Sequence, residues 1–206
     1  MGDPKFSRQK YERPSHPWEG ERIKAENELL KKYGLKNKKE LWRSQHVLRR
    51  FRQRARELQA KVRYGDKQAG KEKDELIARL GRLGLLPTEG ATLGDVLGVD
   101  VEAVLSRRLQ TLAFVKGLAF TPHQARQFIV HGHVAIGPRR VTVPGYLVTR
   151  TEEGGIVYDP RSPISNEMHP ARPGAPPPEP AAEGEAGPPP PAPPGPEAPA
   201  PGGGAP

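Results

Sequence analysis

The last 37 residues constrain the fold most, because they cannot contribute to a hydrophobic core. Pro170–Pro206 contains 16 Pro, 9 Ala, 7 Gly, 4 Glu and 1 Arg, and it has no Leu, Ile, Val or aromatic residue. Such a segment buries too little apolar surface to offset the entropy lost on ordering. We therefore predict a disordered Pro/Ala/Gly-rich tail over residues 169–206 and place the folded part before it.

The residues before the tail are strongly basic. The chain has 33 Lys and Arg against 24 Asp and Glu, and without the tail 32 basic face 20 acidic residues, a net charge of +12. This favours a polyanionic partner, either nucleic acid or an anionic membrane surface. The absence of Cys excludes disulfides and Cys-ligated zinc and fits a reducing compartment. Because no apolar run approaches the roughly 20 residues of a membrane helix and the first residues lack the apolar region of a signal peptide, we expect a soluble cytoplasmic protein.

Apolar periodicity predicts a helical first half. Residues 1–20 are expected to form an extended basic arm, whose Phe6, Tyr11 and Trp18 either stack on bases or anchor the arm. Residues 21–103 are predicted to be a helical domain. Its helices are expected at 21–32, at 38–63 with an Asn37–Glu40 capping box, at 71–83, in one turn capped by Thr92 and Asp95, and at 101–116, which continues into the next domain.

The period changes to two in the second half, so residues 104–168 are predicted to combine helices with a small β unit. Thr121-Pro122-His123-Gln124 is a strong helix start. Strands are expected at 134–136 and 141–143, and a hairpin from 146–148 and 156–158. Gly132 and Gly145 are candidates for positive φ, although Gly132 also fits a plain helix end. The fold class is therefore α+β.

Residues 103–151, which we call the cationic stretch, contain no Asp or Glu over 49 positions, where about six are expected from the chain's average. A phosphate backbone lying against this surface would repel carboxylates and so explain their absence. The alternative is chance in a generally basic protein. The basic residues of the stretch that we consider for RNA contact are Arg107, Arg108, Lys116, His123, Arg126, His131, His133, Arg139 and Arg140.

Three features suggest how the basic residues of this stretch and of the helix before it act. The first turn of the helix at Pro122 offers backbone N–H groups and a positive dipole end to a phosphate, although His123 is equally compatible with plain exposure. The His131–His133 pair lacks the third ligand that a metal needs, so we expect polar donors at a tight turn and no metal. The helix at residues 43–63 is either a solvated face or an RNA contact through arginine forks, and there the candidates are Arg49, Arg50, Arg52 and Arg54.

Motifs of catalysis are absent. The sequence has no Gly-x-Ser-x-Gly, no phosphate-binding loop, no dinucleotide fingerprint and no His-Glu-x-x-His. We therefore expect no catalytic residues, no cofactor and no small-molecule substrate.

Three segments carry a resemblance to a known family. They are Leu105-Ser106-Arg107-Arg108-Leu109, then Gln124-Ala125-Arg126-Gln127-Phe128-Ile129-Val130-His131-Gly132-His133-Val134, then Arg139-Arg140-Val141-Thr142-Val143-Pro144-Gly145-Tyr146. The chain resembles the fourth small-subunit ribosomal protein family in its archaeal and eukaryotic branch, and the likeness extends over most of residues 5–165. The resemblance implies an RNA-binding module of two helices and a β-hairpin, of the αL type. The tail lies outside the family pattern.

The resemblance also implies a function. It implies primary binding to small-subunit ribosomal RNA of the 16S class, early subunit assembly, and support of decoding accuracy through the fifth small-subunit protein, beside other subunit proteins. RNA contact would carry over onto the residues of the cationic stretch named above, whereas the zinc of some bacterial relatives would not, because Cys is absent. The alternative is a free RNA-binding factor for RNA modification or chaperoning; membrane-surface binding is disfavoured because the apolar stripe of the Arg-rich helix suits a protein core.

Overall fold

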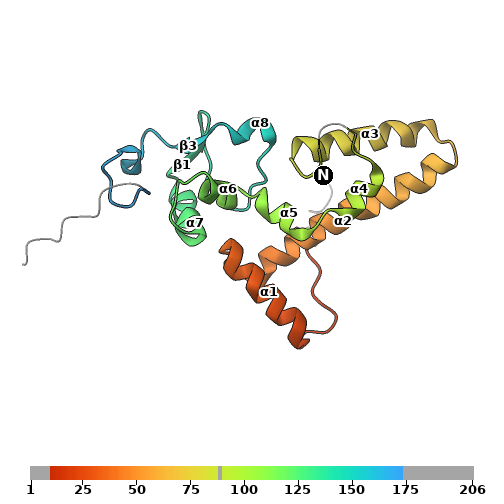
Figure 1. The fold of residues 1–206 in the computed structure, drawn as a ribbon, viewed down its shortest axis with the longest axis horizontal. Coiled ribbons are helices and arrows are strands. Elements are labelled where there is room, and N and C mark those ends of the chain that lie inside the picture. Colours follow the sequence, from red (N-terminus) through yellow and green to blue (C-terminus); the bar gives the residue numbers. More distant parts are fainter. Residues whose placement is uncertain (1–9, 88–89, 174–206) are drawn as a thin grey trace, which may run out of the picture. The chain divides into compact units, whose positions relative to one another are not determined.

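The computed structural model describes residues 10–87 and 90–173 (Figure 1). The other residues, including most of the predicted tail and part of the predicted arm, lie outside this description. The described elements are α1 (Gly20–Tyr33), α2 (Lys38–Arg63), α3 (Lys67–Arg82), α4 (Leu93–Gly98), α5 (Val101–Ser106), α6 (Leu109–Val115), α7 (Pro122–His131), β1 (Val134–Ile136), β2 (Arg139–Arg140), α8 (Arg150–Glu153), β3 (Ile156–Tyr158) and the 3-10 turn η1 (Pro163–Ser165). The predicted α+β class is confirmed.

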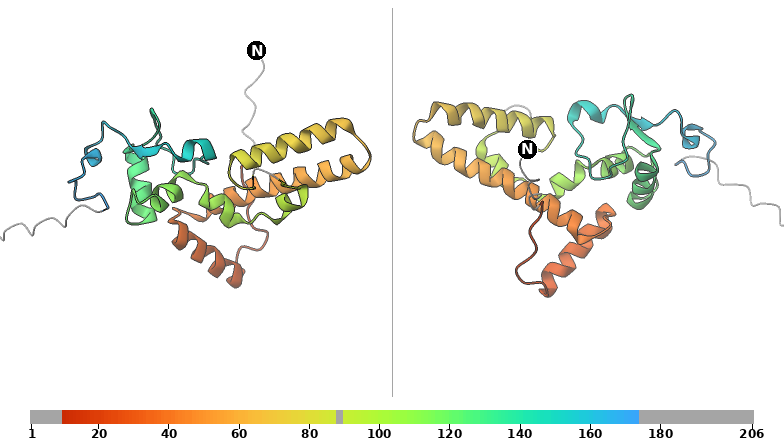
Figure 2. Two further views of the ribbon diagram at one scale, coloured as in Figure 1. Left: turned by 45° about the horizontal axis from the view of Figure 1, so that its top comes forward. Right: turned by 180° about the vertical axis from the view of Figure 1, so that it is seen from behind.

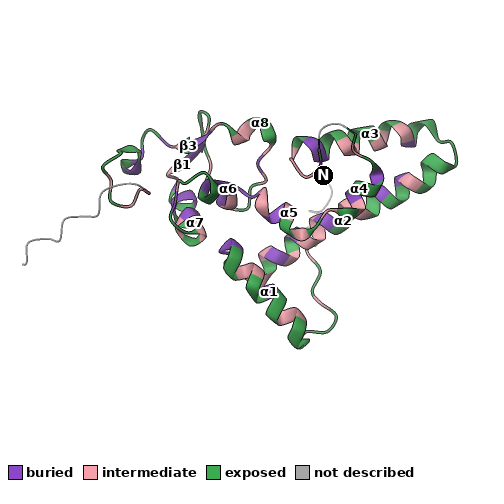
Figure 3. Cartoon of the chain, viewed as in Figure 1, coloured by how far each residue is buried: buried purple, intermediate pink, exposed green. Residues whose placement is uncertain are grey.

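Helices α2 and α3 form a long antiparallel pair, which all views show side by side (Figure 2). Asn37 caps α2 as predicted, since its side chain accepts a hydrogen bond from Glu40 N–H at 3.2 Å. Ala55, Leu58 and Leu80 pack between the helices with Leu86, Leu93 and Val96 of the segment that follows, and Figure 3 shows this buried stripe against exposed outer faces. The Thr92–Asp95 capping box of α4 is confirmed.

The start of α3 was predicted four residues too late. Asp66 follows the end of α2 almost at once, and its side chain accepts a hydrogen bond from Gln68 N–H at 2.9 Å. One short turn therefore ends α2 and caps α3.

The helix predicted at 101–116 is wrong, because the chain breaks at Arg107 and Arg108 into α5 and α6. Arg108 has an extended backbone (φ −73°, ψ 143°) and forms a β-bridge with Leu147. The first amides of α6 are bound to the same loop, Leu109 N–H to Tyr146 O at 2.8 Å and Gln110 N–H to Pro144 O at 3.2 Å. Helical periodicity continues through the break, so the tertiary bridge overrides a pattern that is locally helical.

The β unit also differs from the prediction in its pairing. β1 is the central strand of a three-stranded antiparallel sheet of order β2-β1-β3, with Ala135 opposite Arg140 and Val157. Residues 141–143 form no strand, and the predicted hairpin of 146–148 with 156–158 is wrong because helix α8 intervenes. Thr149 and Glu152 form the capping box of α8. Gly132 ends α7 at φ 76°, whereas Gly145 is not among the glycines of positive φ.

Both ends of the described chain contact the folded part. Tyr11 stacks on Trp42 of α2, with ring centroids 6.2 Å apart, which fits the anchoring interpretation of the arm, whereas Trp18 is exposed. At the other end Arg172 lies 5.1 Å from the centre of the Tyr158 ring, and Ala171 O accepts a hydrogen bond from the Gln124 side chain. Residues 171–172 thus pack on the module although they fall inside the predicted tail.

Candidate nucleic-acid interface

The carboxylate of Glu40 joins the helical part to the predicted module of residues 104–168. Glu40, in the first turn of α2, accepts hydrogen bonds from Arg108 Nη2 at 2.7 Å and from Arg126 Nη2 at 2.5 Å. The side chains of Arg108, Glu40 and Arg126 are 6%, 14% and 20% exposed. Glu40 was predicted to close a capping box with Asn37, but its carboxylate turns to these two arginines instead.

The charge of Glu40 is stabilised by its partners. Burial would raise the pKa of the Glu40 carboxyl, but the hydrogen bonds from Arg126 and Arg108 outweigh it and hold the pKa below its ordinary value. Beside this ion pair the buried Gln110 accepts from Arg126 Nη1 at 3.2 Å and lies, through Nε2, within hydrogen-bond distance of the Gly34 and Pro122 carbonyls. α1, α2, α6 and α7 thus meet at one polar cluster.

Arg107 is also held within the chain. Its guanidinium donates to Glu153 Oε2 at 2.8 Å and to Val148 O at 3.2 Å, and its side chain is 13% exposed. Lys116 donates to the backbone carbonyl of Glu153, although its side chain is otherwise exposed. Arg107 and Lys116 therefore fasten α8 to the ends of α5 and α6.

The exposed cations of the module lie on β2 and on α7. Arg139 and Arg140 are both exposed and follow each other along β2. Arg140 donates to His131 O at 2.8 Å, so its guanidinium lies directly over Gly132, where an added Cβ would come within 2.0 Å of it. His131 and His123 are exposed on α7. These four side chains are exposed to a ligand, and among them Arg140 also lies 4.0 Å from the Asp159 carboxylate.

His133 differs from its neighbour His131. It is half-buried, its Nδ1 lies 2.8 Å from Ser162 Oγ, and its ring meets the edge of Phe128. Burial, together with the nearby charges of His131 and Arg140, lowers the pKa of His133. We therefore assign His133 to the inside of the module as a neutral side chain.

The predicted phosphate site at the start of α7 is already partly occupied by the chain itself. The Gln124 N–H donates to Thr121 Oγ1 at 3.2 Å, and the Ala125 N–H donates to Thr121 O at 3.0 Å. Pro122 has no N–H. Few backbone donors are thus left at this turn.

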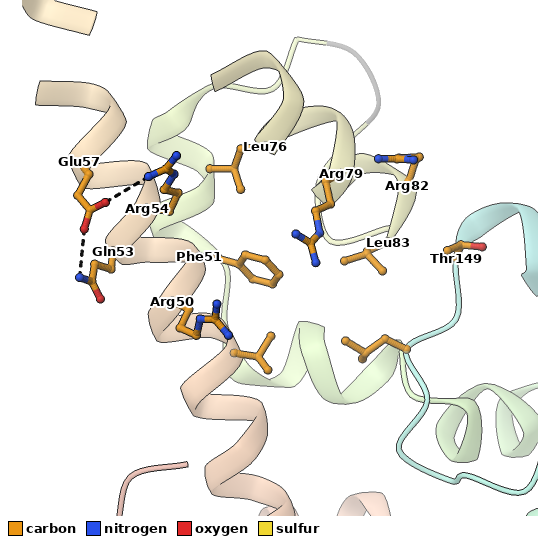
Figure 4. A pocket seen from close by; sticks show the side chains of 12 residues that line it. Arg50, Phe51, Gln53, Arg54, Glu57, Leu76, Arg79, Arg82, Leu83 and Thr149 are labelled. Carbon is orange, nitrogen blue, oxygen red and sulfur yellow. Dashed lines mark hydrogen bonds and ion pairs between the residues drawn. The ribbon is translucent and has the colours of Figure 1, made fainter. Parts of the chain in front are cut away.

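The four arginines predicted on α2 point in different directions. Arg49 pairs with Glu12, and Arg52 donates to Val99 O at 2.6 Å. Arg50 and Arg54 line a groove of about 840 Å³ between α2 and α3, which we call the α2 groove (Figure 4). Arg79 and Arg82 of α3 also line it and were missed in the sequence, although their i, i+3 spacing places them on one face of a helix.

A second hollow of about 320 Å³, which we call the Glu40 pocket, adjoins the first. It is lined by Arg43, Arg108 and Arg126 with Glu40, Pro144 and Gly145. Val47 and Leu147 line both hollows, so the two are neighbours. The module and the α2 groove therefore share one surface.

The cationic stretch is not free of carboxylates in space, which corrects the interpretation of its sequence. Glu40, Glu153 and Asp159, all from outside the stretch, lie against Arg108, Arg107 and Arg140, the last at 4.0 Å. The absence of acids within residues 103–151 therefore leaves these arginines free to bind acids elsewhere in the chain. The number of arginines in the stretch is therefore larger than the number of arginines without an internal carboxylate partner.

The described residues contain no cluster of three or more His, Asp or Glu side chains placed to bind a metal ion. Among the same residues, no helix combines the length and apolarity needed to cross a membrane.

Residues 107–153 match the S4 domain. The chain is also 54% identical, over 172 residues, to small ribosomal subunit protein uS4 of Thermoplasma acidophilum, which covers 84% of this chain and 86% of the relative. The chain belongs to the uS4 family. The uS4 of Picrophilus torridus is likewise 54% identical over 84% of this chain and 93% of its own length, and that of Methanococcus aeolicus is 52% identical over 84% and 96%.

The uS4 assignment confirms the family resemblance. The S4 domain begins at the Arg107–Arg108 break and contains the exposed cations of α7 and β2. The α2 groove lies mainly outside this domain, since only its Leu147 and Thr149 fall within residues 107–153. Identity to the archaeal uS4 proteins over 172 residues shows that the family likeness covers the helical part as well.

Proposed function

We propose that this protein is a structural, non-enzymatic constituent of the small ribosomal subunit and binds its ribosomal RNA. The observation that carries the proposal is the identity of more than half over 172 residues to proteins named small ribosomal subunit protein uS4. The S4 domain and the exposed cations of α7 and β2 support it, because phosphate contacts by Lys and Arg supply most of the affinity for RNA. As a constituent of the ribosome, the protein would reside in the cytoplasm.

The candidate residues divide into two roles under this proposal. Arg139, Arg140, His131 and His123 are exposed and would contact the RNA directly. Arg107, Arg108 and Arg126 would act as positioning residues, because ion pairs with Glu153 and Glu40 already hold them. Lys116 and the exposed arginines of α2 would add phosphate contacts at the margins. Recognition of folded RNA by shape and 2′-OH groups fits such a dispersed set of cations.

The finer aspects of the proposal rest on the family resemblance. They are primary binding to RNA of the 16S class early in subunit assembly, and support of translational accuracy together with the fifth small-subunit protein and other neighbours. The link between the helical part and the module supports an assembly role, because a protein with fixed internal geometry can hold an RNA junction in one arrangement.

The first experiment measures where the protein resides. A subunit constituent should co-sediment with small subunits at one copy each and stay bound in moderate salt. A protein that washes off would instead be the free RNA-binding factor, which would refute the proposal.

The second experiment tests the direct contacts with purified small-subunit RNA. Replacing Arg139 and Arg140 by Gln should lower affinity and reduce the slope of log K against log salt by about one for each lost phosphate contact. Arg161→Gln, an exposed arginine outside the S4 domain, is the matched control. An unchanged slope in the double variant would contradict direct contact by β2.

A further inference from the structure

The α2 groove has an apolar floor surrounded by arginines. Phe51 of α2 and Leu76 and Leu83 of α3 line it, and all three are half-buried. Figure 4 shows the Phe51 ring near the middle of the groove, with Leu76, Arg79 and Leu83 across from it. The ring packs on the α2–α3 core but remains accessible from the groove.

Most of the arginines around this floor lack an internal counter-ion. Arg54 pairs with Glu72 and, at 3.6 Å, with Glu57, the one acidic residue of the lining. Arg50, Arg79 and Arg82 are exposed and form no ion pair with any residue of the described chain. A ligand that fits must therefore combine a flat apolar part with negative charge.

We propose that the α2 groove binds an unstacked base of single-stranded ribosomal RNA, with the base on Phe51 and the flanking phosphates on Arg50, Arg79 and Arg82. This inference rests on the proposed function, because it takes RNA as the partner. A nucleotide offers the planar apolar face of its base together with charged phosphates on either side of it. Stacking of a base on an aromatic side chain stabilises such a complex by about 1–3 kcal/mol per base. Arginine also stacks on bases as well as binding phosphate.

The position of the groove favours RNA over an acidic protein segment. The α2 groove neighbours the Glu40 pocket, with which it shares the lining residues Val47 and Leu147, and that pocket is bounded by Pro144 and Gly145 of the S4 domain. An RNA strand bound along the S4 domain is therefore close to the α2 groove, whose own lining includes Leu147 and Thr149 of that domain. An acidic peptide complements the arginines but makes no special use of an aromatic ring among them.

The test compares two labelled probes on the full chain by fluorescence anisotropy. One is a single-stranded hexamer of uridylate, and the other is an abasic hexamer with the same ribose–phosphate backbone. We expect the wild-type chain to bind the base-bearing probe at least about 5-fold more tightly, which corresponds to the lower end of the stacking energy. Phe51→Leu keeps the apolar bulk but removes the aromatic face, so this ratio should fall towards one.

Two matched variants make the test specific. Phe114→Leu changes an exposed aromatic side chain outside the groove and should leave the ratio unchanged. Arg79→Gln should weaken both probes severalfold, whereas Arg56→Gln, an exposed arginine of α2 outside the groove, should weaken them less. Because Arg79 is exposed, this comparison still tests whether RNA lies in the groove if Phe51→Leu fails to fold, and the two probes on the wild-type chain still test whether a base is bound.

The results separate the inference from the function on which it rests. Equal affinity for the two probes, or an unchanged ratio in Phe51→Leu, overturns base binding in the groove while small-subunit RNA still binds. Loss of all RNA binding in the wild-type chain refutes the proposed function itself. Arg79-dependent binding of an acidic helical peptide, without any preference for the base-bearing probe, assigns the groove to a protein and also overturns the inference.

Discussion

Replacing Glu40 by Gln should destabilise the fold more than any exposed charge change. The substitution leaves Arg108, whose side chain is 6% exposed, without its counter-ion, and it removes the bidentate partner of Arg126. Removing one member of a buried ion pair typically costs 3–5 kcal/mol. Gln keeps one acceptor oxygen, and Arg126 keeps Gln110, so we expect a loss of about 3 kcal/mol, at the low end of that range.

Urea unfolding of the full chain without RNA, followed by far-UV circular dichroism, measures this loss. Glu72→Gln is the matched control, because it breaks a pair with Arg54 in which the two side chains are 29% and 46% exposed, and such surface pairs contribute about 0–1 kcal/mol. If the two variants lose the same free energy of unfolding, the idea that Glu40 holds the two arginines in place is wrong.

Comparison of the wild-type chain with Glu40→Gln also gives a pH test. Folding lowers the pKa of Glu40, so its contribution to stability is fully present above the ordinary carboxyl value of 4.5 and is lost as the pH falls through the lowered value. The difference in unfolding free energy between wild type and Glu40→Gln should therefore be largest near neutral pH and shrink in acid. A difference that grows in acid would contradict the direction of the shift.

Three smaller predictions concern two residues of the module and one helix cap of the helical part. Gly132→Ala should cost about 1–2 kcal/mol through its positive φ, and little more than Gly65→Ala, which has the same φ of 76°, because the atoms that a Cβ at Gly132 would meet are the far end of the exposed Arg140 side chain, which can move; thermal unfolding compares them, and a much larger loss at Gly132 would contradict this. The NMR titration of His133 should have its midpoint below 6.5, and a higher midpoint would contradict its burial. Thr92→Ala should cost about 1 kcal/mol by removing the α4 cap, and no measurable loss in denaturant unfolding would be the opposite result.

Local chemistry made much of the helical part predictable. Asn37, Thr92 and Thr121 each cap a helix where the sequence indicated, because a cap depends on residues only three positions apart. Gly132 ends α7 for the same reason. The Thr149–Glu152 capping box carried the same signal and was missed, because flanking apolar triplets suggested a hairpin instead.

The errors arise where distant segments decide the structure. The break at Arg108 depends on Leu147, nearly forty residues away, and nothing in the helical period around it predicts a strand-like residue there. The candidate site shows the same limit, because the sequence identified basic residues but could not show which of them bind carboxylates from other elements. The sequence indicated only a capping role for Glu40 and gave no role to Arg79 and Arg82. Their contacts became visible only once α2, α3 and the module were seen together.

The carboxylate shared by Arg108 and Arg126 also affects how the chain can be shortened. A fragment that starts at residue 104 keeps both guanidinium groups but loses Glu40, as well as the Gly34 carbonyl that Gln110 reaches. Two arginines that were neutralised would then face solvent as new positive charge, and such a fragment would bind any polyanion more readily than the intact protein does. Measurements of selectivity on an excised module would therefore understate how well the whole chain discriminates between RNAs.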